Sequence, residues 1–505
     1  MLKQLNHPGF PRDFGMGSPY GAKRNAGMPF VRRAGKLMPA LLAAGVLTGC
    51  SLAPKYERPD APIATVYPTE TGSAGANATA TAVGWRDFFP DQRLQSLIET
   101  ALANNRDLRI TALRIEEARA QYNIQSADLL PTFNASAGGS RSRTPGSLTL
   151  SGNSTVSSSY QVGLSLASFE LDFFGRVRSL NNAALAQYLA TEEAARAAKI
   201  SLVAEVAKAY LAERAFAEQY ELARKTVESR EAAYKLARQR FDVGASSALD
   251  LRQNEILAQS ARASLAVLTR QRAQATNALT LLVGTPATAL PPDLSLSAQR
   301  IVTDIPAGLP SDLLTRRPDI RAAEQRLRAA NASIGAARAA FVPRISLTAG
   351  IGTASNALDG LFEANSRTWS FAPQLLLPIF DAGRNSANLS LAEIRNNVAV
   401  AEYEKAIQSA FREVADALAA RAALDEQIDA QRAVQEAQTE RLKLADLRYQ
   451  SGVASSLDVL DAQRELFSAE QALVQARLLR LTNAIDLYRA LGGGVEANGS
   501  QAASK

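Results

Sequence analysis

The sequence has little of the chemistry that most active sites use, because its 505 residues include one histidine, His7, and one cysteine, Cys50. A lone cysteine excludes an intramolecular disulfide, and because no histidine lies beyond position 7, the rest of the chain has no histidine for a His-based triad, a zinc site or a proton shuttle. All four methionines lie within residues 1–38, which argues against a soft-metal relay. Neither a nucleophile elbow nor a Gly-rich phosphate loop is present. We therefore expect a protein that is not an enzyme, with no catalytic residue, no metal and no cofactor other than a covalent lipid on Cys50.

The positive charge is concentrated at the start of the chain. Residues 1–49 hold seven of the 56 basic residues and one of the 49 acidic residues. The remainder is close to neutral, with charges of both signs interspersed at helical spacing. A nucleic-acid-binding protein carries a basic patch or stripe, so we expect no nucleic acid partner.

The basic head resembles a bacterial targeting segment. An apolar stretch, Leu37–Leu47, follows the basic residues and is too short to span a bilayer. The sequence Leu47–Cys50 then matches the lipobox of bacterial lipoproteins, which implies cleavage after residue 49 and acylation of Cys50, including palmitate. Ser51 follows in place of the aspartate typical of inner-membrane retention, which implies delivery to the outer membrane.

The rest of the chain contains an internal duplication, in which each half repeats one order of elements. At an offset of 208 residues the matched pairs are Gly175 with Gly383, Gly244 with Gly452, Ser247 with Ser455 and Asp250 with Asp458. At an offset of 212, Asp107 matches Asp319 and Pro131 matches Pro343.

Long helices are predicted where proline is absent, from 146 to 285 and from 379 to the end. Apolar residues recur at every seventh position, which indicates coiled-coil packing: Tyr220, Val227, Tyr234 and Phe241, then Leu460, Phe467, Val474, Leu481 and Tyr488. We expect one helix from about Thr191 to Val243, about 75 Å long at about 1.5 Å per residue. A further helix is expected from Asp91 to about Leu130.

Two helical hairpins are predicted to turn at matching sequences. Gly244 and Gly452 suit the positive φ of a helix C-cap. Capping boxes follow, Ser247 with Asp250 and Ser455 with Asp458. These residues are assigned a geometric role at the tips.

Between the helices lie segments with strand periodicity, at 160–167 and 344–351, with partners at 133–141 and 367–377. One face of each is apolar and the other is small or polar. Tyr160 and Trp369 suit the interfaces of a membrane, although a soluble sandwich shows the same alternation. Four strands cannot close a barrel, and lipid does not tolerate an open edge, so oligomerisation is predicted.

These features together resemble the outer membrane efflux proteins, the TolC-like outer membrane factors, in their lipoprotein (NodT-type) branch. The resemblance is carried by the lipobox, the duplicated order of elements, the segment Arg317–Arg321 and the stretch Arg448–Gln463. It implies an α+β membrane protein, a homotrimer with a 12-stranded outer-membrane β-barrel, four strands per protomer, continued by a periplasmic α-helical barrel of coiled-coil hairpins. It also implies passive conduction in a tripartite efflux system with a periplasmic adaptor and an inner-membrane transporter, of the resistance-nodulation-division type.

The resemblance assigns roles to residues at the tips. Leu457 and Asp461 correspond to rings that close the tunnel, with Arg448 or Arg240 as candidate partners of Asp461. Residues expected to meet the adaptor are Gly244, Ala245, Gly452 and Val453. The alternative is a lipid-anchored coiled-coil adaptor or structural lipoprotein without a pore.

The predicted organisation has six segments: a signal peptide (1–49), a lipidated linker or equatorial segment (50–90), a first efflux repeat (91–285), a second linker (286–317), a second repeat (318–491) and a flexible tail (492–505). The expected location is the cell outer membrane, with the helices extending into the periplasm.

Overall fold

The computed structural model describes residues 51–68, 83–150, 152–286, 290–302 and 310–493. The predicted signal peptide and Cys50 lie outside the described residues. The predicted tail lies outside them from residue 494 onward.

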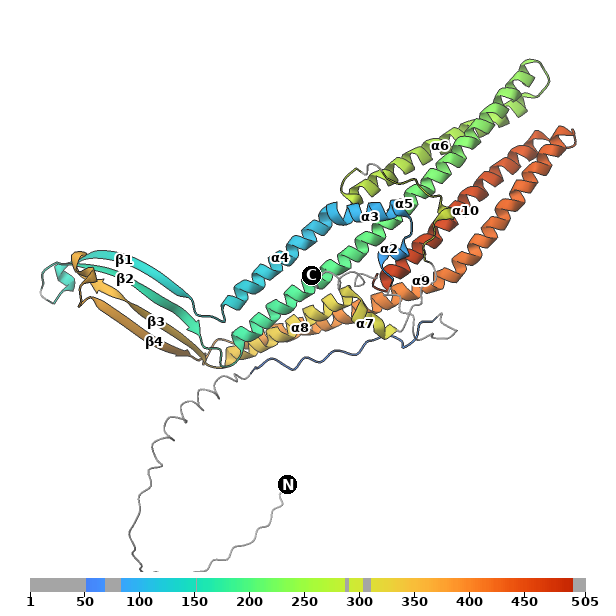
Figure 1. Ribbon diagram of the computed structural model, residues 1–505. Coiled ribbons are helices and arrows are strands. Elements are labelled where there is room, and N and C mark those ends of the chain that lie inside the picture. Colours follow the sequence, from blue (N-terminus) through green and yellow to red (C-terminus); the bar gives the residue numbers. More distant parts are fainter. Residues whose placement is uncertain (1–50, 69–82, 151, 287–289, 303–309, 494–505) are drawn as a thin grey trace, which may run out of the picture. The chain divides into compact units, whose positions relative to one another are not determined.

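Two long helical hairpins dominate residues 51–493 (Figure 1). The first consists of α5 (Arg176–Asp242) and α6 (Ala248–Val283), and the second of α9 (Arg384–Gln450) and α10 (Ser456–Ala490). Helices α5 and α9 have 67 residues each. The predicted start near Thr191 is therefore wrong, because α5 already begins after Gly175, whose φ of 72° only glycine adopts readily.

Shorter helices precede or connect these hairpins. They are α2 (Trp85–Phe88), α3 (Gln92–Asn104), α4 (Arg106–Ala127), α7 (Leu313–Arg316) and α8 (Pro318–Arg338). Single 3₁₀ turns occur at Gly146–Leu148, Leu296–Ala298, Pro310–Asp312, Ala339–Phe341 and Asp359–Phe362.

The single helix predicted from Asp91 to about Leu130 is wrong, because the chain breaks at Asn105 between α3 and α4. The Asn105 side chain accepts a hydrogen bond from the backbone of Leu108 at 2.8 Å and caps α4. Its amide also donates to the carbonyl of Leu282 on α6 at 2.8 Å. Capping and a tertiary contact together offset the cost of interrupting the helix.

The duplication appears directly in the structure. Helices α5 and α9 both begin after a left-handed glycine, and α6 and α10 have 36 and 35 residues. Helix α4 corresponds to α8, since each leads into a strand. The predicted duplication therefore describes two copies of one backbone design.

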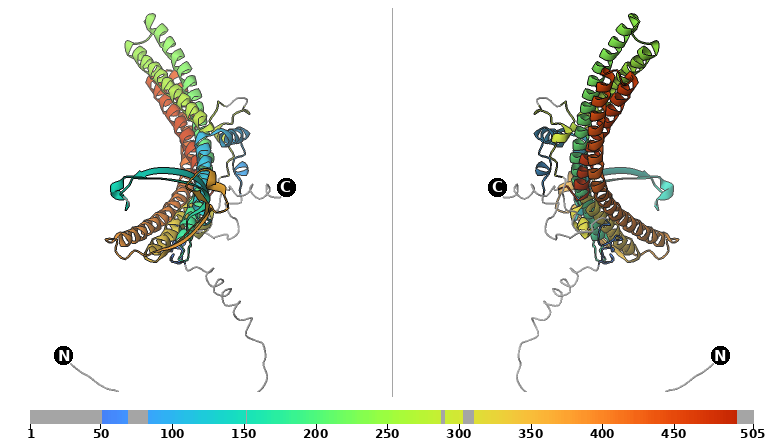
Figure 2. Two further views of the ribbon diagram at one scale, coloured as in Figure 1. Left: turned by 90° about the vertical axis from the view of Figure 1, so that its left-hand side faces the viewer. Right: turned by 90° about the vertical axis from the view of Figure 1, so that its right-hand side faces the viewer.

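The main core lies where the short helices pack against the middle of the long ones, and Figure 2 shows α2 and α3 to one side of them. Phe88 stacks on Tyr488 with ring centroids 4.1 Å apart. Buried Asp91 accepts hydrogen bonds from Tyr210 at 2.9 Å and from Gln299 at 2.8 Å. This region anchors both hairpins.

The heptad positions differ in burial. Val474, Leu481 and Tyr488 of α10 are buried close to this core, and Leu460 is buried near the tip. Phe241, at the tip end of α5, is 39% exposed. The tip of the first hairpin is therefore the less buried at these positions.

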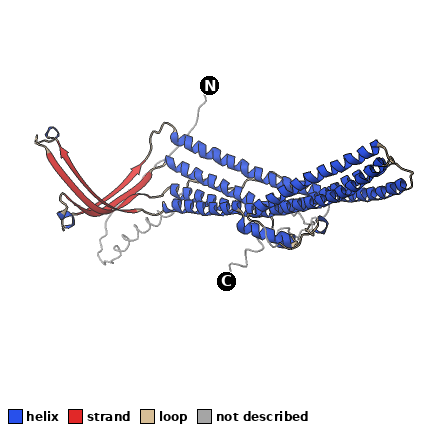
Figure 3. Ribbon diagram, turned by 90° about the horizontal axis from the view of Figure 1, so that it is seen from above, coloured by secondary structure: helices blue, strands red, loops and turns tan. Residues whose placement is uncertain are grey.

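A four-stranded sheet occupies the other end of the helices (Figure 3). Its strands are β1 (Phe133–Thr144), β2 (Thr155–Glu170), β3 (Arg344–Ser355) and β4 (Arg367–Leu376). All neighbours are antiparallel, in the order β1-β2-β3-β4, so the four predicted strand segments are confirmed. One irregularity in β2, between Leu166 and Phe169, shifts its register with β3.

Candidate channel wall and gate

The sheet has one apolar face, because the register places apolar residues opposite one another. Leu164 pairs with Ile351, which pairs with Trp369. The next row joins Phe133, Leu166, Ala349 and Phe371. Trp369 is 80% exposed in the protomer. A well-ordered apolar surface this exposed requires a non-aqueous environment, and a transmembrane barrel strand has this pattern.

The opposite face is small and polar. One of its rows contains Ser136, Gly163, Gly352 and Thr368. A Cβ on Gly163 would lie 2.7 Å from the carbonyl oxygen of Ile351, and one on Gly352 would lie 2.4 Å from that of Val162. The neighbouring strands therefore leave no room for a side chain at either glycine. Tyr160 and Trp369, predicted for membrane interfaces, lie on the other, apolar face.

The two outer strands, β1 and β4, each have one edge without a partner among the described residues. Among those same residues, no helix combines the length and apolar character needed to cross a bilayer. The exposed apolar face makes the sheet the candidate membrane segment, and in lipid its two free edges would have to be paired, since lipid cannot satisfy exposed backbone groups.

The turns at the hairpin tips have the predicted geometry. Gly244 and Gly452 have φ of 73° and 72°, and Ala245 and Val453 donate backbone hydrogen bonds back into the preceding helices. Val453 is 70% exposed. The predicted adaptor-contacting residues therefore form short, rigid and accessible tips.

Both predicted capping boxes are present. The backbone of Asp250 donates to the Ser247 hydroxyl at 3.1 Å, and the backbone of Ser455 donates to Asp458 at 3.1 Å. The Ser247 hydroxyl also donates to the Asp250 carboxylate at 2.7 Å. These bonds hold the pKa of Asp250 below its usual range.

Two hydrogen bonds join the hairpins near their tips. Arg240 on α5 donates to the hydroxyl of Tyr449 on α9 at 2.8 Å. The hydroxyl of Ser456 on α10 donates to Asp250 at 3.3 Å. We call these two bonds the tip latch. The latch was not predicted, because it joins residues 209 and 206 positions apart in the chain. The signal in the sequence is that Tyr449 and Ser456 replace the Phe241 and Ala248 of the first hairpin.

The carboxylate of Asp461 has different partners from those predicted. It accepts hydrogen bonds from Arg441 on α9, at 2.9 Å, and from Arg464 one turn later on α10. The predicted partners Arg448 and Arg240 are wrong, because both lie on the final turns of their helices, whereas Asp461 lies more than one turn beyond the tip. Leu457 is 54% exposed. Arg464 also pairs with Glu465 at 3.3 Å, so the second hairpin presents an apolar residue and a cluster with two cations and two anions.

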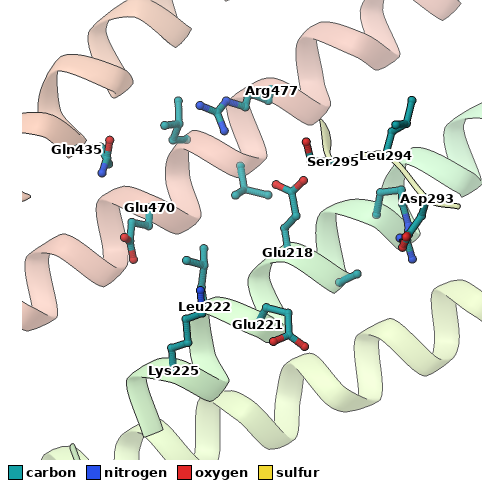
Figure 4. Close-up of a pocket in the computed structure, with 14 residues that line it drawn as sticks. Glu218, Glu221, Leu222, Lys225, Asp293, Leu294, Ser295, Gln435, Glu470 and Arg477 are labelled. Atoms are coloured by element: carbon teal, nitrogen blue, oxygen red, sulfur yellow. The ribbon is translucent and has the colours of Figure 1, made fainter. Parts of the chain in front are cut away.

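A groove of about 520 Å³ lies farther from the tips between the two hairpins (Figure 4). Glu218, Leu222 and Lys225 line it from α5, and Glu470 and Arg477 line it from α10. Burial raises the pKa of Glu470, and the charge of Lys225 opposes this increase. The seam between the hairpins thus contains a carboxyl group that is poorly solvated.

Residues 51–68, here called the N-terminal strap, run along α8. Arg58 forms an ion pair with Glu324 at 2.9 Å, and Asn331 donates to the carbonyl of Pro54 at 2.9 Å. A Cβ on Gly335 would lie 2.7 Å from that of Ala53. Because residue numbers fall along the strap as they rise along α8, its start lies near the strand-bearing end of that helix.

Among the described residues no group of three or more His, Cys, Asp or Glu is positioned to hold a metal ion.

An amphipathic sheet with unpaired edges is joined to long helical hairpins with specialised tips. This combination defines the class of protein, a membrane-inserted channel subunit.

The particular family follows from comparison with known proteins. Residues 97–285 and 309–493 match the family described as Outer membrane efflux protein, and the chain belongs to that family.

Two curated relatives and two solved structures illustrate the similarity. Outer membrane protein OprJ of Pseudomonas aeruginosa is 52% identical over 459 residues, covering 90% of this chain and 95% of OprJ. Toluene efflux pump outer membrane protein TtgC of Pseudomonas putida is 46% identical, covering 91% and 95%. The open-state MtrE channel of Neisseria gonorrhoeae has a TM-score of 0.81 at 46% identity, covering 89% and 99%. The CmeC channel of Campylobacter jejuni has a TM-score of 0.83 at 28% identity, covering 89% and 96%.

The relatives are named as an outer membrane protein and an efflux pump outer membrane protein, and the solved neighbours as outer membrane channels, so the predicted family, fold class, function and location are confirmed. The protein is an outer-membrane channel of an efflux system that extends into the periplasm. The alternative of a lipoprotein or adaptor without a pore is accordingly set aside.

Proposed function

We propose that three copies of the chain close a single barrel of 12 strands, with β4 of each protomer pairing with β1 of the next. The observation that carries this proposal is the amphipathic sheet with two unpaired edges. Strands alternate in direction through the sheet, so β4 and a neighbouring β1 meet antiparallel, as the ladder requires. The apolar face then meets lipid, and the face with Gly163 and Gly352 lines the lumen.

The helical hairpins of the three protomers continue this lumen into the periplasm and conduct substrate passively. In a trimer, seams between hairpins alternate: one lies within a protomer and the next lies between protomers. The tip latch supports the closed state, since Arg240 with Tyr449 and Ser456 with Asp250 hold the second hairpin to the first. Opening requires these bonds to part.

The narrowest part of the closed tunnel consists of rings of Leu457 and Asp461. Leu457 is available for this role because its side chain is exposed in the protomer. Arg441 and Arg464 pair with each Asp461, and Arg464 also pairs with Glu465, so the ring is close to neutral instead of carrying the uncompensated charge of three carboxylates. This arrangement reduces repulsion among the Asp461 groups and lowers the attraction for cations.

The periplasmic adaptor is proposed to contact Gly244, Ala245, Gly452 and Val453. Small residues permit close approach of another helical hairpin, and the rigid capping boxes present the same turn in both repeats. An inner-membrane transporter of the resistance-nodulation-division type would supply the substrate. Relatives are named for antibiotic, toluene and solvent efflux, so we propose small organic compounds as the substrates.

A lipid on Cys50 completes the membrane attachment in this proposal. The N-terminal strap supports it, because Ala53 and Pro54 are held against Gly335 and Asn331 near the strand-bearing end of α8. An acyl chain on Cys50 would therefore start close to the inner leaflet of the outer membrane. Mass measurement of the Cys50→Ser variant should show loss of the acyl groups, with the trimer retained.

The pore is tested by single-channel conductance of the purified protein in planar bilayers. We expect rare, small openings for the wild type and larger, steadier ones for the Leu457→Ala, Asp461→Ala double variant. Absence of conductance together with a monomeric native mass would contradict the trimeric pore. Equal conductance of the two proteins would retain the pore and reject this gate.

A further inference from the structure

Charged residues are rare in the sheet, and the two ends of the sheet carry different sets of them. The four strands contain five: Arg141 and Arg143 on β1, Glu170 on β2, Arg344 on β3 and Arg367 on β4. Glu170 and Arg344 form an ion pair at 2.5 Å near the helices. The other three all lie toward the end of the sheet remote from the helices, and all are positive.

The register places these three arginines on the apolar face. Arg141 pairs with Ser158 and Arg143 with Val156, in the same alternating series that pairs Phe133 with Leu166. Arg367 pairs with Thr353, two residues along from the pair of Trp369 with Ile351. The polar face at this end has serine and threonine but no charge: its residues include Ser140, Ser142, Ser157, Ser159 and Thr368.

None of the three arginines forms an ion pair with a residue that the structure describes. All three are exposed or half-exposed, and Arg143 has a 3.3 Å hydrogen bond to the uncharged Ser154. Desolvated guanidinium groups without an anionic partner are costly, so a membrane-facing position calls for an external anion.

The three arginines lie at the outer limit of the apolar surface of the sheet, measured along the membrane normal from the row of Phe133. Phe133 and Arg141 are eight residues apart, about 26 Å along a strand at about 3.3 Å per residue, or about 20 Å along the membrane normal after a tilt of about 40°. Extended arginine side chains reach farther toward the surface. The guanidinium groups therefore lie at the level of the lipid headgroups in the outer leaflet.

We propose that these arginines form a binding site for the phosphate groups of outer-leaflet lipid. The site rests on the trimeric closure proposed above, which brings Arg367 on β4 to the same seam as Arg141 and Arg143 on a neighbouring β1. Each seam then carries three like charges from two protomers. Guanidinium pairs with phosphate through two parallel hydrogen bonds, and a phosphate between the protomers offsets their mutual repulsion. Lipid is the occupant because the arginines share the lipid-facing side with Trp369.

The test is native mass spectrometry of delipidated trimers titrated with bisphosphorylated lipid A, with dephosphorylated lipid A and with inorganic phosphate. A charge-matched variant moves each guanidinium to the opposite face: Arg141→Ser with Ser140→Arg, Arg143→Ser with Ser142→Arg, and Arg367→Thr with Thr368→Arg. A second variant carries Arg141→Gln, Arg143→Gln and Arg367→Gln. It tests the same lipid binding if the charge-matched variant does not form trimers.

We expect the half-saturating concentration of bisphosphorylated lipid A to rise at least about tenfold in either variant, which corresponds to about 1.4 kcal/mol. Dephosphorylated lipid A and inorganic phosphate should bind the wild type weakly. Equal binding of the two lipids, or unchanged binding by intact trimers of the Gln variant, would overturn the site. Absence of wild-type trimers in the same spectra would instead count against the proposed function.

Discussion

The two hairpins have nearly the same backbone and different side chains at their tips. Each has a left-handed glycine and a capping box, in the same places. The hydroxyls of the tip latch belong to the second hairpin, at Tyr449 and Ser456. The equivalent residues of the first hairpin, Phe241 and Ala248, have no hydroxyl.

The charge cluster differs in the same way. Asp461 with Arg441 and Arg464 occupies positions that are Gln253, Ala233 and Ile256 in the first hairpin. Duplication therefore preserved the shape of the hairpin, while a few substitutions gave the second copy a distinct surface.

This difference predicts two kinds of seam in a trimer. Within a protomer, Arg240 and Asp250 find hydroxyl partners on the second hairpin. Between protomers, the equivalent Arg448 and Asp458 would face a first hairpin with Phe241 and Ala248. Neither of those side chains has a hydroxyl, so neither hydrogen bond of the tip latch can form there. Alternate seams are then latched and unlatched.

The largest effect is expected from removing the latch. In the Tyr449→Phe, Ser456→Ala variant the second hairpin acquires the residues of the first. Two hydrogen bonds of about 1 kcal/mol each would be lost per protomer, which raises the open-to-closed ratio at least about tenfold. Single-channel open probability measures this change.

The reciprocal variant is the matched control. Phe241→Tyr with Ala248→Ser adds two hydroxyls to the first hairpin, to which Arg448 of a neighbour would donate and from which its Asp458 would accept. Its open probability should fall below that of the wild type. An increase in both variants would mean that tip substitutions of any kind loosen the gate, contrary to the distinction between seams.

The next largest effect concerns ion selectivity. Asp461→Gln introduces the first hairpin's residue and leaves Arg441 without its carboxylate partner, while Arg464 keeps only Glu465. The ring becomes more positive, so the ratio of cation to anion permeability should fall several-fold. Reversal potentials in a salt gradient measure the ratio. The Gln253→Asp variant adds a carboxylate to the other hairpin and should change the ratio little. An increase in the ratio as large as the decrease in Asp461→Gln would contradict the assigned role of the second hairpin.

Sequence patterns predicted the repeated parts of this fold because they rest on local rules. Strand alternation located β1 to β4, and glycine with Ser-x-x-Asp located both tips. The predicted partner of Asp461 was wrong, because the antiparallel packing of α9 on α10 places Arg441 opposite it, whereas Arg448 and Arg240 lie nearer the tips. The break at Asn105 was missed for a similar reason: its amide hydrogen-bonds to Leu282, a residue remote in sequence.

A moderate effect is expected at the N-terminal strap. Burial raises the pKa of Glu324, but hydrogen bonds from Arg328 and Arg58 outweigh it and hold the pKa below the ordinary 4.5. The stability that this pair supplies is therefore present above about pH 4.5 and is lost as pH falls through the lowered value. Glu324→Gln should cost about 1–2 kcal/mol at neutral pH.

Limited proteolysis of the strap between pH 7 and pH 3 checks this prediction. The wild type should become sensitive as the solution is acidified, and Glu324→Gln should be sensitive throughout. Glu99→Gln, which removes an exposed ion pair with Arg86 elsewhere, is the control and should behave as the wild type. Equal sensitivity of all three proteins at neutral pH would contradict the anchoring role.

The smallest effect is a pH dependence of the seam between the hairpins. Because the folded protein raises the pKa of Glu470 above the ordinary 4.5, the seam is most stable below that value and loses stability as pH rises through the raised pKa. The facing groups include Lys225 and Arg477 as cations and Glu218 and Glu221 as anions.

Open probability should therefore rise two- to threefold, a change of roughly half a kcal/mol, between mildly acidic and neutral pH. Glu470→Gln should keep the acidic behaviour at both values. A wild-type response that persists in Glu470→Gln would assign the dependence to another group.

The central claim is that the seam within each protomer must part for the channel to conduct. A variant with Tyr449→Phe, Asp250→Cys and Ser456→Cys lacks the latch but can be cross-linked across the same seam, and Cys50 is the chain's one native cysteine. Conductance should be high under reducing conditions, fall to the closed level after oxidation, and return on reduction. Equal conductance of the oxidised and reduced protein, with the cross-link verified by mass, would contradict the account.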